Sequence, residues 1–280
     1  AFTNDLQPDE LLSMPIAHGE GRFLMEDRLL DELIARGQTT FRYCDNAGEV
    51  IDEFPTNPNG AKYNLAAVTN PAGNCLAMMP HTERSRAGDK IFTSLRTYLT
   101  SQKRIIAAPL RYSPPKSDLA SFSPQPRALQ YAIRLIITDN EAVTVKKTLE
   151  DIGIHADIRR YTHWEIELDD QCDHELLESA IRASGELYNN RKEREIRFRN
   201  EPVLGPTRHI LVRYRDDVFG QSKTEALQNR LGISGVKKAH RGTLWRVAVG
   251  RGNIDEVVRH IMNTQILGNP ISQATYIYSV

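Results

Sequence analysis

A histidine and a glutamate two positions apart, His81 and Glu83, are the pair in this 280-residue chain whose types and spacing best suit catalysis. They lie in residues 78–84, at the end of an apolar run typical of a β-strand. In an extended backbone alternate side chains point to one side, so imidazole and carboxylate would share a face. An imidazole activates a cysteine thiol, and a carboxylate on its other ring nitrogen orients it. The spacing predicts such a base and orienter, although two solvated side chains in a loop would have the same spacing.

A second polar cluster lies in residues 15–23, Pro-Ile-Ala-His-Gly-Glu-Gly-Arg-Phe, where His18 and Glu20 are also two positions apart. The glycines beside Glu20 would allow the backbone to approach a ligand or another chain closely. The same pattern suits a tight turn with solvated polar residues. Neither His-x-Glu pair is accompanied by further ligands at the spacing of a zinc site, so no metal site is predicted.

Three motifs, in this order, resemble a known family: residues 15–23, the Asn-Pro-Asn-Gly at 57–60, and the Met-Met-Pro-His-Thr-Glu-Arg at 78–84. They resemble the glutaminase subunits of phosphoribosylformylglycinamidine synthase, which are class I glutamine amidotransferases. The resemblance extends over about residues 2–99, roughly the C-terminal half of such a subunit. We therefore expect residues 1–110 to be the C-terminal part of a glutaminase domain.

The resemblance implies roles for particular residues. His81 and Glu83 would complete a Cys-His-Glu triad, and Thr82 stands where the family has a proline. Three further side chains are expected near the active site or a subunit contact: His18, Glu20 and Arg22.

The family's cysteine nucleophile lies on a Gly-x-Cys-x-Gly elbow, and none of the three cysteines here has that setting. Cys44 and Cys172 lack both glycines, and Cys75 precedes His81 by six positions on the same predicted strand. We expect the half of the domain with the nucleophile to lie upstream, on another chain, or to have been removed. The chain by itself is then expected to be inactive.

The resemblance also implies a reaction and partners. A thiolate would attack the side-chain amide of glutamine, and ammonia would pass to a large subunit that activates formylglycinamide ribonucleotide. ATP and magnesium are expected on that large subunit, and no cofactor on this chain.

Local patterns predict the elements around the candidate site. Residues 26–37 form an amphipathic stripe that ends in Gly37, which favours a helix with a glycine cap. Residues 70–74 predict the turn of a hairpin, and residues 88–106 a second helix. Residues 111–127 contain four prolines among serines and predict a linker.

The rest of the chain contains two similar segments, at 128–200 and 207–280. Each reads strand, helix, strand, strand, helix, strand, with the middle hairpins at 157–168 and 236–249. Trp164 and Trp245 recur 81 positions apart and are expected in the core. This is the order of a ferredoxin-like βαββαβ fold, so the fold class is α/β: part of a glutaminase followed by two such repeats. We expect the repeats to pack together, sheet to sheet or edge to edge.

Both repeats resemble the small subunit of the same synthase, the second more closely through the Leu-Gly-Asn-Pro at 267–270. The alternative is a non-catalytic assembly or regulatory protein, because tandem βαββαβ units also resemble ACT domains that bind amino acids. A glycine-rich turn should then follow each first strand. Residues 139–141 provide none, whereas Phe219-Gly220 in the second repeat is a partial match, and we prefer the synthase resemblance.

Composition narrows the classes of function. Thirty-six basic and thirty-six acidic residues give zero formal net charge, which argues against nucleic-acid binding. No apolar stretch is long enough to span a bilayer, and three scattered cysteines do not form a disulfide framework. The sequence therefore predicts a cytoplasmic protein, and its start at Ala1 suggests a processed product or a piece of a longer chain.

Overall fold

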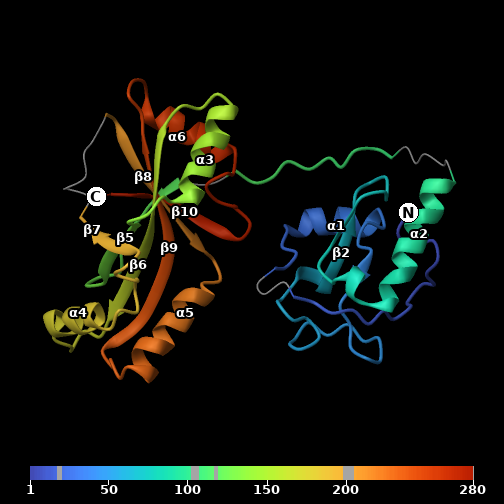
Figure 1. The fold of residues 1–280 in the computed structure, drawn as a ribbon, viewed down its shortest axis with the longest axis horizontal. Helices are drawn as coiled ribbons and strands as arrows, with labels where there is room; N and C mark the ends of the chain where they lie inside the picture. Colours follow the sequence, from blue (N-terminus) through green and yellow to red (C-terminus); the bar gives the residue numbers. More distant parts are fainter. Residues whose placement is uncertain (18–20, 102–106, 117–118, 198–204, 280) are drawn as a thin grey trace. The chain divides into compact units, whose positions relative to one another are not determined.

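The computed structural model describes residues 1–280 except 18–20, 102–106, 117–118, 198–204 and 280. The described chain divides into two compact units, Ala1–Pro114 and Pro115–Val280 (Figure 1). The boundary falls within the predicted linker.

The first unit is a small antiparallel sheet with two helices. Helix α1 (Asp27–Ala35) buries Leu30 and Leu33, and Gly37 follows it at a φ of 64°, as the sequence predicts. The sheet has the order β1-β2-β3. Its strands, three short 3₁₀ turns and the closing helix are β1 (Phe41–Arg42), β2 (Leu65–Thr69), β3 (Leu76–Met78), η1 (Lys62–Asn64), η2 (Thr82–Arg84), η3 (Arg86–Gly88) and α2 (Asp89–Thr100).

The predicted hairpin joins β2 to β3, since these strands are antiparallel and Thr69 pairs with Leu76. The core of this unit is small. Among the described residues, only seven of the 36 buried apolar side chains belong to it.

The second unit contains one seven-stranded sheet, in the order β4-β10-β8-β9-β6-β5-β7. The first repeat provides β5 (Leu129–Leu135), α3 (Asn140–Asp151), β6 (Asp157–Leu168), α4 (His174–Ala183) and β7 (Glu193–Ile196). The second repeat provides β8 (Thr207–Tyr214), α5 (Val218–Glu225), a π-helical turn (Ala226–Arg230), β9 (Val236–Ala248), α6 (Ile254–Asn263) and β10 (Gln273–Tyr278).

The predicted hairpins at 157–168 and 236–249 are wrong, because each region is one long strand, β6 or β9. Each repeat is therefore βαβαβ instead of βαββαβ. A tight hairpin needs turn residues, and β6 contains no glycine, proline or asparagine. Gly242 of β9 lies inside the strand opposite His163, and a Cβ there would lie 2.7 Å from Leu211 Cδ1. This glycine therefore leaves space for the Leu211 side chain and does not form a turn.

The two repeats join edge to edge through β6 and β9, which pair antiparallel along their length. This agrees with the expectation that they pack together. Thr162 pairs with Thr243, its own counterpart at the 81-residue offset of the tryptophans, so an internal two-fold axis passes through this pair.

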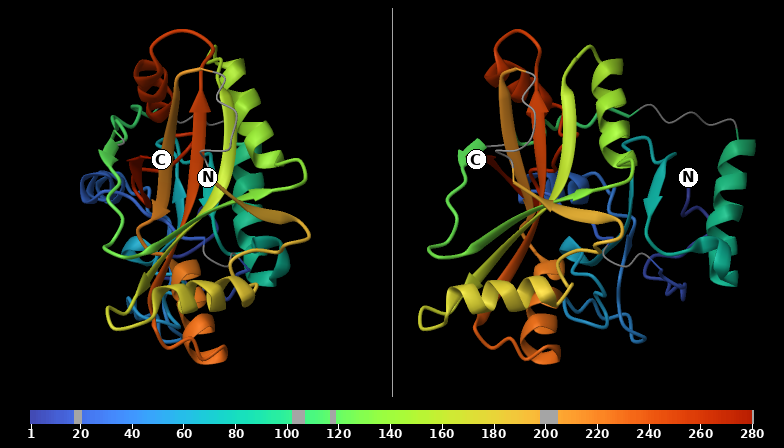
Figure 2. Two further views of the ribbon diagram at one scale, coloured as in Figure 1. Left: turned by 90° about the vertical axis from the view of Figure 1, so that its left-hand side faces the viewer. Right: turned by 60° about the vertical axis from the view of Figure 1, so that its left-hand side comes forward.

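The four α-helices in the described part of this unit pack on one face of the sheet, and each pair of neighbouring helices combines one helix from each repeat. Helices α3 and α6 share one apolar cluster, and α4 and the turn after α5 share another. Figure 2 shows α3 and α6 toward one end of the sheet and α4 and α5 toward the other. Trp164 and Trp245 are 5% and 2% exposed, so both are core residues as predicted.

Part of the predicted linker at 111–127 belongs to the sheet. Strand β4 (Leu119–Ser121) pairs in parallel with β10 at its edge. Phe122 continues this pairing through a hydrogen bond from its N–H to the Ile277 carbonyl, 2.7 Å. The serines and prolines around it did not prevent pairing, because an edge strand needs partners on one side only.

Candidate active site

His81 and Glu83 meet in the loop between β3 and α2. His81 Nδ1 lies 2.7 Å from Glu83 Oε1. Their proximity was predicted from an extended strand, but an extended strand does not produce it. Strand β3 ends at Met78, and Glu83 lies in the 3₁₀ turn η2. Pro80 lies between strand and turn, and a proline cannot donate to a ladder. The tight turn brings the carboxylate back to the ring.

The contact determines which ring nitrogen is free for chemistry. A carboxylate only accepts hydrogen bonds, so Nδ1 carries the hydrogen and the neutral ring keeps its lone pair on Nε2. A hydrogen bond from its own backbone N–H, followed by the one from His81, lowers the pKa of the Glu83 carboxyl. Arg84 Nε, 3.5 Å from Glu83 Oε1, adds a positive neighbour. The ionised carboxylate can therefore orient the ring and stabilise an imidazolium.

Hydrogen bonds to residues 13 and 15, just before and at the start of the first motif, fix this loop. The His81 N–H donates to the Pro15 carbonyl at 2.9 Å, and the Ser85 hydroxyl donates to the Ser13 carbonyl at 2.8 Å. Gly88 packs against the backbone of Thr82. A Cβ on Gly88 would be 2.9 Å from Thr82 Cα and closer still to the Thr82 carbonyl oxygen. The loop geometry thus requires a glycine at the start of α2.

Gly88→Ala should therefore displace the turn and separate His81 from Glu83. We expect a destabilisation of about 1–3 kcal/mol, typical of overpacking, measured by thermal unfolding. The His81 ring resonances should lose the signature of the carboxylate contact. Gly250→Ala is the matched control, since nothing lies within 4 Å of its Cβ position. Equal behaviour of the two variants would contradict the steric role of Gly88.

The first and second motifs contact each other. Arg22 Nη1 donates to the Asn59 carbonyl at 3.3 Å, and Asn59 Nδ2 donates to the Gly21 carbonyl at 3.0 Å. His18 and Glu20, the other two candidates of the first motif, lie outside the described residues. The role of Arg22 near an active site or subunit contact stays a prediction.

Asn57 holds the turn of the second motif together, a role that was not predicted from the sequence. It is 4% exposed; its amide donates to Asp52 at 2.6 Å and to the Ala61 carbonyl at 2.8 Å, and its oxygen accepts from the Ala61 N–H at 2.9 Å. The signal was present in the Asn-Pro-Asn-Gly turn at 57–60, where asparagines bond to nearby backbone.

A cavity of about 500 Å³ gathers all three motifs. Ile16 of the first, Pro58 of the second, and Met78 and Pro80 of the third line it. Its walls also include Phe41, Tyr43 and the apolar residues of the 10–16 segment. Its lining is about equally polar and apolar, with Glu10, Arg42 and Asp45 among the polar residues, and neither His81 nor Glu83 lines it. A concave site that combines apolar walls with placed polar groups is a usual form of a small-molecule site.

None of the cysteines is placed as the family's nucleophile. Cys75 lies in the hairpin turn, where its N–H donates to Asn70 Oδ1 at 2.9 Å, at the other end of β3 from His81. Cys172 belongs to the second unit. Cys44 lines the cavity, but its neighbours are Tyr43 and Asp45, so it does not lie on a glycine elbow.

Comparison with known proteins supports the resemblance for this unit. The model of the CobB/CobQ-like glutamine amidotransferase domain matches residues 2–96. Residues 2–96 are a PurQ-like glutamine amidotransferase domain.

Relatives named phosphoribosylformylglycinamidine synthase subunit PurQ match about a third of the chain. The one from Methanothrix thermoacetophila is 41% identical over 115 residues, 35% of this chain and 44% of that protein. Those from Methanocaldococcus jannaschii and Aquifex aeolicus are 45% and 46% identical over 93 and 85 residues, covering 33% and 30% of this chain and 39% and 37% of theirs. The chain thus spans less than half the length of these PurQ relatives.

Two further findings concern the described residues alone. No group of three or more histidine, cysteine, aspartate or glutamate side chains there could hold a metal ion. No helix there is both long and apolar enough to cross a membrane.

Proposed function

We propose that the first unit provides the base and the orienting carboxylate of a glutaminase that supplies ammonia to phosphoribosylformylglycinamidine synthase. The observation that carries the proposal is the 2.7 Å contact of His81 Nδ1 with Glu83 Oε1, within residues that match an amidotransferase domain. ATP and magnesium would act on the large partner subunit, in the cytoplasm, and this chain would need no cofactor.

His81 would move the protons of the reaction. Its Nε2 takes the proton of a cysteine thiol, and the thiolate attacks the amide carbon of glutamine. The ring then gives the proton to the leaving nitrogen, so that ammonia departs and a thioester remains. Water, deprotonated by the same nitrogen, releases glutamate and regenerates the thiol. Glu83 keeps Nδ1 protonated throughout and stabilises the imidazolium.

We place the nucleophile in a partner half that completes the domain. The small core of the first unit supports this, as do the large side chains that it leaves exposed. Phe54 is 81% exposed, Leu99 69% and Leu11 51%. Leu11 also lines the cavity of the three motifs, where an added layer of structure would bury apolar surface.

The second unit would connect the glutaminase to the large subunit. Its second repeat has the Leu-Gly-Asn-Pro resemblance to the synthase's small subunit, and the β6–β9 pairing joins both repeats in one sheet. This role is independent of catalysis.

The 280-residue chain by itself should release no glutamate from glutamine, because a base without its nucleophile cannot form the thioester. Addition of a separately produced N-terminal half of a PurQ glutaminase should restore the release. Glutamate formed per minute is the measurement, and Cys44→Ser is the decisive variant, since this thiol lines the cavity. Activity of the chain alone that Cys44→Ser abolishes would overturn the proposal.

A further inference from the structure

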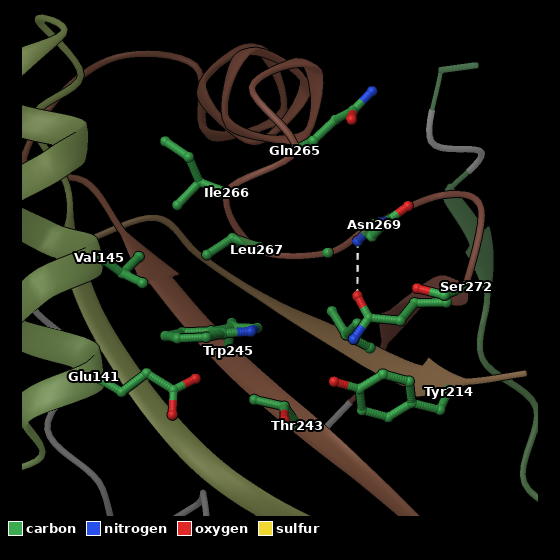
Figure 3. A pocket seen from close by; sticks show the side chains of 13 residues that line it. Glu141, Val145, Tyr214, Thr243, Trp245, Gln265, Ile266, Leu267, Asn269 and Ser272 are labelled. Carbon is green, nitrogen blue, oxygen red and sulfur yellow. Dashed lines mark hydrogen bonds between the residues drawn. The ribbon is translucent and has the colours of Figure 1, made fainter. Parts of the chain in front are cut away.

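A second cavity, of about 400 Å³, lies in the other unit at the junction of the repeats. Glu141 and Val145 of α3 form one side, and β8, β9 and the loop from α6 to β10 form the rest (Figure 3). Its apolar wall consists of Val145, Val212, Ile266 and Leu267. This volume is in the lower range of small-molecule sites, about 300–1,000 Å³.

The indole nitrogen of Trp245 is an unpaired buried donor at this cavity. Trp245 is 2% exposed, and its Nε1 has no hydrogen-bond partner. Figure 3 shows the ring between Leu267 and Thr243, with its nitrogen on the side of Tyr214 and Asn269. Leaving a buried donor unpaired is unfavourable because its lost hydration is not replaced, so a missing acceptor is the simplest explanation.

The first repeat shows what a purely structural tryptophan does in the same fold. Trp164 Nε1 donates to the Leu187 carbonyl at 3.1 Å. The loop after the helix is otherwise alike in both repeats: Asn189 N–H donates to Glu193 at 2.8 Å, and Asn269 N–H donates to Gln273 at 2.7 Å. The unpaired indole is thus a departure of the second repeat and not a property of the fold.

A second departure occurs at the same cavity. Gln265 has a φ of 59°, a left-handed conformation that is strained for a residue with a Cβ. Its counterpart 80 positions earlier is Gly185, which adopts a φ of 67° without that strain. The strained residue places a polar side chain in the lining of the cavity, where its Nε2 donates to the Pro115 carbonyl at 3.3 Å. Strain kept at a concave polar site is a feature of functional positions.

We propose that this cavity binds a small uncharged molecule of the carboxamide or lactam class, whose carbonyl accepts from Trp245 Nε1. Glu141 is the sole charged residue among the thirteen that line it, so an anionic ligand would face a carboxylate and no lining cation. Glu141 is itself paired with Arg160 Nη1 at 2.8 Å. An amide offers the required acceptor and also a donor for the Thr243 hydroxyl or Glu141. This site lies outside the glutaminase proposal and does not depend on it.

Benzamide is a suitable probe, with benzoate as its charged isostere. In the full chain labelled with ¹⁵N, benzamide should shift one of the two indole N–H resonances saturably, at concentrations on the order of millimolar. Trp245→Phe should remove that resonance and so assign it, and the Trp164 indole serves as the internal control. Benzoate should bind about tenfold more weakly, because its charge meets Glu141.

Affinity of the variants completes the test. Calorimetry should find benzamide binding about three- to tenfold weaker in Trp245→Phe, the loss of one neutral hydrogen bond. Gln265→Gly restores the residue of the first repeat, so it should keep the thermal stability and still weaken binding. The site is refuted if the Trp245 indole does not respond to benzamide, if benzoate binds equally well, or if both variants bind benzamide as tightly as the parent.

Discussion

His81→Ala is expected to abolish amidine formation from glutamine and to leave formation from added ammonium salt nearly unchanged. The measurement uses the synthase reconstituted from this chain, the half with the nucleophile and the large subunit. The loss with glutamine should be about 10²–10⁴-fold or more, the usual contribution of a general base. Ammonia bypasses the glutaminase, since the ATP-dependent step occurs on the large subunit in our proposal. His81→Ala should therefore lower the rate with glutamine and leave the rate with ammonium salt nearly unchanged.

Glu83→Gln should give a smaller loss in the glutamine assay, because the amide can retain the contact with Nδ1 but not the charge that stabilises the imidazolium. His155→Ala, at an exposed histidine of the second unit, is the matched control and should change neither assay. Equal loss with glutamine and with ammonia would instead assign His81 to folding or subunit contact. An unchanged rate with glutamine would refute its role as the base.

The family resemblance of the first unit could be predicted from sequence, whereas the geometry of its His81–Glu83 loop could not. Motif order indicated the amidotransferase, and the glycine after α1 predicted its end. The contact of His81 with Glu83 was predicted from a strand, whereas a 3₁₀ turn produces it. That turn depends on Gly88 and on the Pro15 carbonyl, which lie 7 and 66 positions from His81, so no local pattern contains it.

In the second unit the repeat could be recognised from the sequence, but the pairing of its long strands β6 and β9 could not. An alternating pattern over 12 residues fits one long strand as well as two short ones, and only the partner strand decides. The burial of both tryptophans followed from their recurrence. The unpaired indole of Trp245 did not, since its environment combines α3 of one repeat with a loop of the other.

The other face of the seven-stranded sheet buries a histidine that the catalytic proposal does not use. His163 of β6 is 0% exposed, and its ring lies edge-on to Phe122 and Tyr278 at centroid distances of 5.8 and 5.2 Å. Arg213 Nη2 donates to its Nδ1 at 3.3 Å, since a guanidinium cannot accept. Arg213 Nη1 also donates to buried Glu165 at 2.7 Å.

Burial, and then the positive charge of Arg213, lowers the pKa of His163 to about 3. In the unfolded chain a histidine titrates near pH 6.5. Between these values the unfolded state binds a proton that the folded state does not, so stability decreases as the pH falls from about 6.5 toward 3. From pH 7 to pH 5 this one group should cost the second unit about 2 kcal/mol.

His163→Gln should remove that loss, because an amide oxygen can still accept from Arg213 and does not titrate. The measurement is denaturant unfolding at pH 7 and pH 5, followed by tryptophan fluorescence, which reports the second unit since Trp164 and Trp245 both belong to it. His155→Gln, at an exposed position, should keep the slope of the parent. Parallel pH dependences of the parent and His163→Gln would mean that His163 is protonated in the folded state, against the burial and the Arg213 contact that keep it neutral.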